Sequence, residues 1–152
     1  MAPRNESLDA IKSRRNNTLN ALVSSVPYIR WLGIGFDRRG DELTAVLPFD
    51  EKLIGNPMLP ALHGGSTAAL LEMTAMAQVS LTYPRLRLPR PINVTVAYLR
   101  SGRPIDVYAR ARINKAGRRV AHVVAEAWQD ARQDPIASLT AHFLLDPESE
   151  GS

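Results

Sequence analysis

The chain has 152 residues, no cysteine and a formal net charge of +4, and its hydrophobic fraction (45%) and charged fraction (22%) are those of an ordinary globular protein. One domain with a sizeable core is expected. The lack of cysteine excludes disulfides and thiolate metal sites and fits a cytoplasmic protein, while the three scattered histidines form no zinc pattern. No apolar run approaches the ~20 residues that span a bilayer, and the arginines match no nucleic-acid-binding signature. We therefore expect no cofactor, no metal, no membrane contact and no nucleic acid.

Hydrophobic periodicity predicts the elements in chain order. A polar lead with a helix over residues 7–24 occupies residues 1–27 and ends at Pro27. The main domain is predicted over residues 28–145, and a disordered tail over residues 146–152. Within the domain we expect two short strands (33–38 and 42–47), a proline-rich loop (48–62), a long helix (66–83), an arginine-bearing loop (84–91) and four strands (92–99, 105–113, 120–128 and 136–145).

The long helix is the element around which the rest is organised. Its apolar residues cover all sides instead of one stripe, so we expect it to be buried all round. Its one charge is Glu72. A buried carboxylate must be paired, neutralised or used, because a low dielectric disfavours an isolated charge. The element order predicts an α+β protein with an antiparallel sheet curled around this helix, and a second copy of the chain covering what the sheet leaves open.

The start of the helix carries a second feature. Gly64 and Gly65 let a ligand approach the backbone, and Ser66 or Thr67 can cap the first turn. The free N–H groups there, at the positive end of the helix dipole, suit an oxyanion or a polarised carbonyl oxygen. His63 directly precedes the glycines. Each feature alone usually has a structural role, but together with Glu72 they indicate a catalytic site.

These residues resemble a known family, the hotdog-fold acyl-CoA thioesterases of the PaaI-like and 4-hydroxybenzoyl-CoA type. The family signature is an Asn a few residues before His-Gly-Gly and an Asp or Glu nine residues after the His. Asn56, His63 and Glu72 occupy those positions here. The likeness runs over residues 28–145 and includes the segment Tyr98-Leu99-Arg100 and the hairpin residues Gly117-Arg118.

The resemblance implies a hotdog fold, a curved antiparallel sheet wrapped around a long central helix, and hydrolysis of an acyl-CoA thioester to the free acid and CoA. In this interpretation the backbone N–H of Gly65 polarises the carbonyl, and Glu72 attacks it or activates water. His63 and Asn56 would orient the thioester. Gly64 would admit the substrate to the backbone.

Two arginines, Arg100 and Arg118, are candidates for binding the CoA phosphates.

The spacing of Gly65 and Glu72 bears on the assembly. These residues lie seven positions apart and therefore ~10 Å apart along the helix axis. One thioester cannot easily contact both residues in one chain. We therefore expect a homodimer or homotetramer with sites shared between chains, as the resemblance also implies.

Two alternatives stay open. The segment 72–78 resembles the central helix of hotdog hydratases and dehydratases, which act on enoyl or β-hydroxyacyl thioesters, although their upstream His-Phe-Pro type loop is missing here. A non-catalytic acyl-CoA-binding protein is the other alternative. Two prolines favour this alternative. Pro60 stands where the family often has Gly, and Pro91 stands where many members have Ser or Thr.

Overall fold

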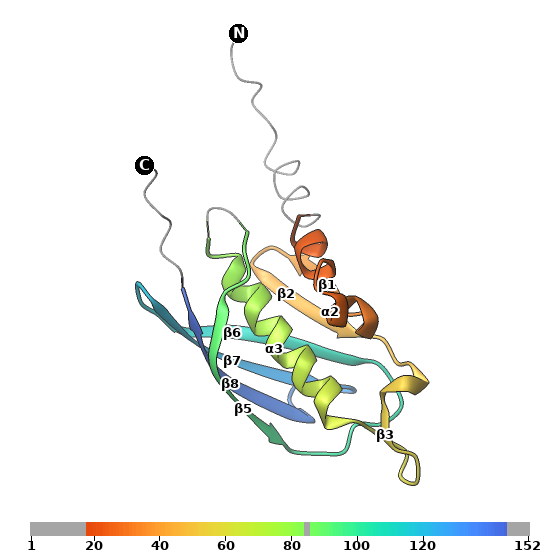
Figure 1. Ribbon diagram of the computed structural model, residues 1–152. Helices are drawn as coiled ribbons and strands as arrows, with labels where there is room; N and C mark the ends of the chain where they lie inside the picture. Colours follow the sequence, from red (N-terminus) through yellow and green to blue (C-terminus); the bar gives the residue numbers. More distant parts are fainter. Residues whose placement is uncertain (1–17, 84–85, 146–152) are drawn as a thin grey trace.

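The computed structural model describes residues 18–83 and 86–145. A six-stranded antiparallel sheet with the strand order β1-β2-β6-β7-β8-β5 forms one layer, and the long helix α3 (Gly64–Ser80) lies across its inner face (Figure 1). The strands are β1 (Gly35–Arg39), β2 (Glu42–Leu47), β5 (Arg90–Tyr98), β6 (Val107–Ala116), β7 (Val120–Trp128) and β8 (Ala137–Leu144). The predicted α+β arrangement, an antiparallel sheet around one central helix, is confirmed.

The segment before the sheet differs from the prediction. Of the helix expected over residues 7–24, only residues 18–24 lie within the described part, and they are helical. The sequence predicts that Pro27 ends the helical segment, but in the structure it begins a second helix, α2 (Pro27–Leu32). Proline suits the first position of a helix because its missing N–H would have no partner there. The predicted tail, residues 146–152, lies outside the described residues.

The predicted loop over residues 48–62 also contains regular structure. It holds a 3-10 helix, η1 (Glu51–Leu53), and two short strands, β3 (Ile54–Asn56) and β4 (Ala61–Leu62), which pair with each other. Elements of two or three residues are too short for hydrophobic periodicity to reveal. A Cβ atom on Gly55 would lie 2.7 Å from the Cα of His63, so glycine is needed for β3 to pass this close to the backbone that leads into α3.

Helix α3 rests on a sheet face of small side chains. The alanines of this face are at most 2% exposed: Ala45, Ala109, Ala121, Ala125, Ala127, Ala137 and Ala141. Because alanine projects little from the sheet, the helix can approach closely, and larger side chains such as Leu70, Leu71 and Phe143 fill the core between the two layers. The predicted alternation on β7 and β8 is therefore confirmed as the core-facing pattern.

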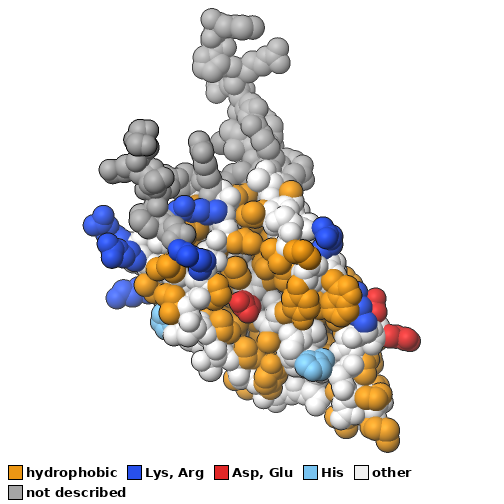
Figure 2. Space-filling view, viewed as in Figure 1, with side chains coloured by type: hydrophobic (Ala, Val, Ile, Leu, Met, Phe, Trp, Pro, Cys, Tyr) orange, Lys and Arg blue, Asp and Glu red, His pale blue; other side chains and the backbone are white. Residues whose placement is uncertain are grey.

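Within the single chain, α3 is buried only on the side that faces the sheet, and the predicted cover by a second copy of the chain stays a prediction. The side of the helix that faces away from the sheet carries Gly65, Ala69, Glu72 and Met76, which are exposed or half-buried. These positions recur every three or four residues and therefore form one stripe along the helix. Figure 2 shows hydrophobic side chains over much of this face of the molecule, with Lys and Arg side chains toward its edges.

The two edges of the sheet differ in character. Edge strand β1 has five residues, three of them charged, and Asp37 and Arg39 form an ion pair on it. Edge strand β5 has nine residues and carries no charge between Pro91 and Tyr98. All of its residues except Val96 are exposed. None of the helices in the described ranges is both long and apolar enough to cross a membrane.

Candidate active site

The start of α3 is capped by His63. The ring Nδ1 of His63 accepts a hydrogen bond from the backbone N–H of Gly65 at 2.9 Å, and the His63 N–H donates to the carbonyl of Leu53 at 2.7 Å. A neutral ring that accepts at Nδ1 carries its proton on Nε2. The capping residue is thus a histidine in place of the predicted serine or threonine, since the Ser66 hydroxyl donates to the His63 carbonyl at 2.7 Å instead.

This cap changes which backbone donor is available. The Gly65 N–H, which the sequence analysis assigns to the substrate carbonyl, is occupied by His63, so a carbonyl can reach it only if the imidazole turns away. The N–H of Gly64 is the first of the helix and has no hydrogen-bond partner among the described residues. Gly64 therefore offers a free donor at the positive end of the helix dipole without any rearrangement.

Asn56 lies at the end of β3, beside β4, in the turn that leads toward the helix start. Its side-chain Oδ1 accepts a hydrogen bond from the N–H of Met58 at 3.0 Å. Asn56 therefore stabilises this turn. Contact with a substrate through its amide nitrogen stays a prediction.

Glu72 lies two turns farther along α3, on the half-buried stripe with Gly65 and Met76. Within residues 18–83 and 86–145, no hydrogen bond or ion pair holds its carboxylate. Its neighbours along the stripe, Ala69 and Met76, offer no polar contact. The carboxylate is thus held in an apolar setting on the open face of the helix, where it is available to a ligand or to a second chain.

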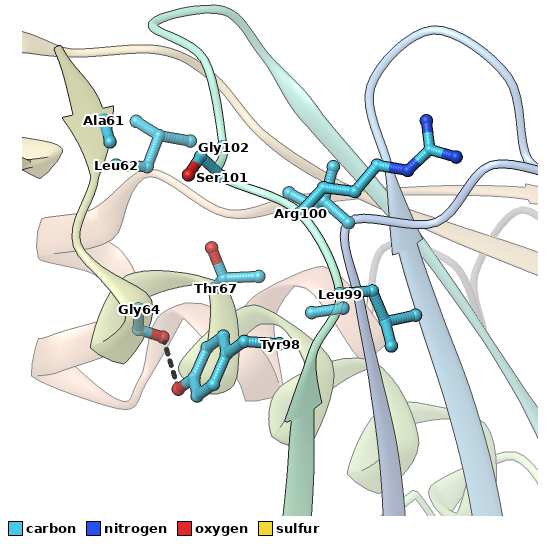
Figure 3. Close-up of a pocket in the computed structure, with 11 residues that line it drawn as sticks. Ala61, Leu62, Gly64, Thr67, Tyr98, Leu99, Arg100, Ser101 and Gly102 are labelled. Carbon is cyan, nitrogen blue, oxygen red and sulfur yellow. Dashed lines mark hydrogen bonds between the residues drawn. The ribbon is translucent and has the colours of Figure 1, made fainter. Parts of the chain in front are cut away.

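A cavity of about 420 Å³ opens beside the first turn of α3, between the helix and the segment 99–102 that follows β5 (Figure 3). The Tyr98 hydroxyl donates to the Gly64 carbonyl at 3.0 Å. A Cβ atom on Gly64 would lie 3.0 Å from the Tyr98 ring, so the glycine allows the ring to lie against the helix start. Tyr98 and Thr67 both line this cavity, and neither is predicted as a site residue from the sequence.

The two arginines take different positions. Arg100 lines the cavity, but its guanidinium is directed away from Gly64 and pairs with Asp134 at 3.5 Å (Figure 3). Arg118 is exposed in the hairpin between β6 and β7. That hairpin lies beside the Arg90 end of β5, whereas Gly64 contacts Tyr98 at the other end. A single chain therefore brings Arg100, but not Arg118, near the helix start.

The structure thus gathers His63, Gly64 and Gly65 at one point and places Glu72 on the same helix but farther along it. Tyr98 could have been found from the sequence as the polar end of an alternating strand, but nothing in the sequence shows that its hydroxyl reaches Gly64. The described residues contain no cluster of three or more His, Cys, Asp or Glu side chains suited to a metal ion.

The comparison with known families decides the identity of this fold. A family model described as the acyl-CoA thioesterase N-terminal domain matches residues 55–144, which include His63, Gly64, Gly65 and Glu72. The chain belongs to the acyl-CoA thioesterase family. The predicted resemblance to hotdog-fold thioesterases is therefore confirmed.

Solved structures agree with this family assignment. A protein of Chromobacterium violaceum is 34% identical, with a TM-score of 0.70, over 93% of this chain and 100% of that protein. A Shewanella oneidensis protein related to the thioesterase superfamily is 26% identical, with a TM-score of 0.74, over 90% and 98% of the two chains. A Bacillus halodurans protein solved with CoA shares the fold at 20% identity and a TM-score of 0.71, over 95% and 99%. No curated protein gives a significant match.

Proposed function

We propose that the protein hydrolyses an acyl-CoA thioester to the free acid and CoA. The observation that carries this proposal is helix α3, which presents an N–H at its N-terminus and the Glu72 carboxylate two turns farther along, both without a hydrogen-bond partner among residues 18–83 and 86–145. Membership of the acyl-CoA thioesterase family supports the substrate class. The Bacillus halodurans protein of the same fold, which was solved with CoA, adds further support.

In the proposed reaction the thioester carbonyl oxygen lies at the helix N-terminus. The Gly64 N–H donates to it, and the Gly65 N–H adds a second donor if the His63 ring turns aside. Each donor aimed at the developing oxyanion is typically worth ~3 kcal/mol. The Glu72 carboxylate either attacks the carbonyl carbon or removes a proton from an attacking water. The C–S bond then breaks, and CoA leaves as the thiol after taking up a proton. In the nucleophilic route a mixed anhydride with Glu72 remains, and water hydrolyses it, which releases the acid and restores the carboxylate.

The same geometry supports an active site shared between two copies of the chain. Gly64 and Glu72 are eight residues apart, ~12 Å along the helix axis, so one carbonyl cannot contact both within one chain. Two antiparallel α3 helices facing each other through their half-buried stripes would bring Glu72 of each chain opposite the helix start of the other. Two equivalent sites would then form across a two-fold axis.

The edge strand β5 supports the same assembly. A long edge strand without charges is a ready template for pairing with another chain, and proteins usually protect such edges with charges or cover them. Strand β1 is protected by its charges, but β5 exposes Ile92, Val94 and Tyr98. A second copy pairing along β5 would cover these side chains and, at the same time, the adjacent stripe of α3.

An acyl-CoA panel tests the proposed function. Release of free thiol from at least one acyl-CoA, with the acid as the second product, is the expected result. The same samples are monitored for hydration of enoyl-CoA. Addition of water without CoA release would show the hydratase instead, and tight binding of acyl-CoA with no reaction across the panel would show a non-catalytic binding protein.

The dimer is tested by Val94→Lys on β5, because a lysine there would place a charge in the proposed interface. We expect the variant to be monomeric by light scattering and to lose thioesterase activity. Val120→Lys is the matched control, since Val120 is exposed to a similar degree, 40% against 36% for Val94, but belongs to the inner strand β7, which β8 separates from β5. A variant at position 94 that stays dimeric and active would exclude β5 from the interface.

A further inference from the structure

The hydroxyl of Thr67 is a polar group of the cavity beside Gly64 that has no part in the proposed reaction. Thr67 is only 4% exposed, and Figure 3 shows its side chain in the cavity with the hydroxyl directed toward the Ser101-Gly102 side. No hydrogen bond of this hydroxyl occurs within the described ranges. Arg38 Nη1 is the only polar side-chain atom of the described residues that is both fully buried and unpaired, so the Thr67 hydroxyl must be accessible from the cavity. A ligand that fills the cavity must therefore either pair with this hydroxyl or leave it without a partner, which is unfavourable.

The other buried hydroxyls of α3 show what is unusual about Thr67. Ser66, Thr74 and Ser80 each donate to a backbone carbonyl one turn back along the helix, at 2.7, 2.6 and 2.6 Å. The corresponding acceptor for Thr67 is the His63 carbonyl. That oxygen already accepts from both the Ser66 hydroxyl and the Ser66 N–H, at 2.7 and 3.1 Å. The Thr67 hydroxyl is therefore left to the cavity.

Part of the cavity lining is buried and apolar. Gly64, with its free N–H, lies at one wall. The floor is made of Leu62, Ile136 and Ala137, which are at most 9% exposed and offer only apolar side chains. A thioester whose carbonyl is bound at the helix start extends from it in two directions, with the acyl group on one side and CoA on the other. The CoA part carries the charged nucleotide and must reach solvent, so the buried apolar residues of the lining suit the acyl group.

The distance between the two polar groups limits where an oxygen on the acyl group can lie. Thr67 follows Gly64 by three residues, a rise of ~4.5 Å along the helix. With one hydrogen bond at each end, the hydroxyl can reach an oxygen that is only a few bonds from the thioester carbonyl. An oxygen on the third carbon of the acyl chain meets this condition, whereas a plain alkyl chain leaves the Thr67 hydroxyl unpaired.

We propose that this cavity binds the acyl group and that Thr67 selects acyl-CoA substrates with a hydroxyl or oxo oxygen at the third carbon. This inference rests on the thioesterase function proposed above and adds the substrate class. The selectivity arises because a site with a buried hydrogen-bonding group discriminates against an analogue that cannot pair with it. No covalent role is assigned to Thr67, which acts through a hydrogen bond to the substrate.

The test compares matched substrates: butyryl-CoA with 3-hydroxybutyryl-CoA, and hexanoyl-CoA with 3-hydroxyhexanoyl-CoA, both enantiomers of each hydroxy compound being included. For the wild-type protein we expect kcat/KM to be about tenfold higher for the preferred 3-hydroxy compound, the effect of one hydrogen bond in a buried site. Thr67→Val keeps the shape and removes the hydroxyl, so the preference should disappear. Thr67→Ser should retain it.

Thr74→Val is the matched control, because it makes the same change in a buried threonine of the same helix whose hydroxyl is already bonded to Leu70. This variant should keep the wild-type preference. Equal kcat/KM for both members of each pair in the wild-type protein, or an unchanged preference in Thr67→Val, would overturn the proposal while leaving the thioesterase function intact.

A failure of the thioesterase function gives a different result, namely no CoA release from any substrate. The cavity proposal is then decided by calorimetric binding of the same substrate pairs. Tighter binding of the 3-hydroxy compound to the wild-type protein, lost in Thr67→Val, would support the acyl pocket, whereas equal affinities would overturn it. The two proposals can therefore fail separately.

Discussion

Replacement of Glu72 by glutamine is expected to lower kcat by about 10³-fold or more while the protein stays folded. Glutamine keeps the size of the side chain and removes both the negative charge and the basic oxygen, so neither attack on the carbonyl nor activation of water is possible. Binding does not require the charge, so KM should change little. The measurement is steady-state thiol release, with circular dichroism to confirm the fold.

The melting temperature of this variant should be equal to or higher than that of the wild-type protein. The Glu72 carboxylate has no ion pair or hydrogen bond within the described part of the chain, so its removal breaks no such interaction and takes a charge out of an apolar setting. Glu126→Gln on the outer face of the sheet is the control, because Glu126 makes only a surface contact with Arg132 at 4.0 Å. Near-normal turnover in Glu72→Gln would remove Glu72 from the mechanism.

The nucleophile and general-base roles of Glu72 can be separated in the wild-type protein. In a single turnover in water labelled with ¹⁸O, a general base places the label directly in the released acid. A nucleophilic Glu72 gives its own unlabelled oxygen to the acid and takes up the label when water attacks the Glu72 carbonyl of the anhydride, so label in the peptide that contains Glu72 establishes the nucleophilic route. Mass spectrometry of the acid and of the peptide that contains Glu72 distinguishes the two results.

Much of the fold could be predicted because long, periodic segments carry their own signal. Strands β7 and β8 show alternating small apolar residues, and α3 is a run without glycine or proline after Gly65. The short elements were not predicted because they lack such a signal. Helix α2 and the pair β3 and β4 are too short to show a period, and tertiary contacts hold them in place, such as the passage of Gly55 beside His63.

The candidate site was predictable in its residue types but not in its hydrogen bonds. The sequence indicates His63, the two glycines and Glu72 as a group, and the structure places the first three together. It cannot show that His63 occupies the Gly65 N–H, or that Ser66 takes the carbonyl that Thr67 would otherwise use. These facts depend on competition between neighbouring donors for one acceptor, which only the folded geometry resolves.

If the active site is shared between two chains, two inactive variants should restore each other's activity in a mixed dimer. Gly65→Val is one partner, because a Cβ at Gly65 would lie 2.9 Å from the His63 Nδ1, so valine displaces the capping ring and obstructs the helix N-terminus. Glu72→Gln is the other. Each variant alone should be nearly inactive, the first lacking an accessible carbonyl site and the second lacking the carboxylate.

When the two variants are unfolded together, mixed in equal amounts and refolded, half of the dimers should contain one chain of each kind. In such a dimer one site combines the intact helix start of the Glu72→Gln chain with the intact Glu72 of the Gly65→Val chain, while the other site carries both changes. One good site in half of the dimers gives about a quarter of wild-type activity. Native mass spectrometry measures the mixed dimer. If that dimer forms and activity stays at the level of the separate variants, then the two residues do not meet across the interface, and the catalytic site must be built within one chain.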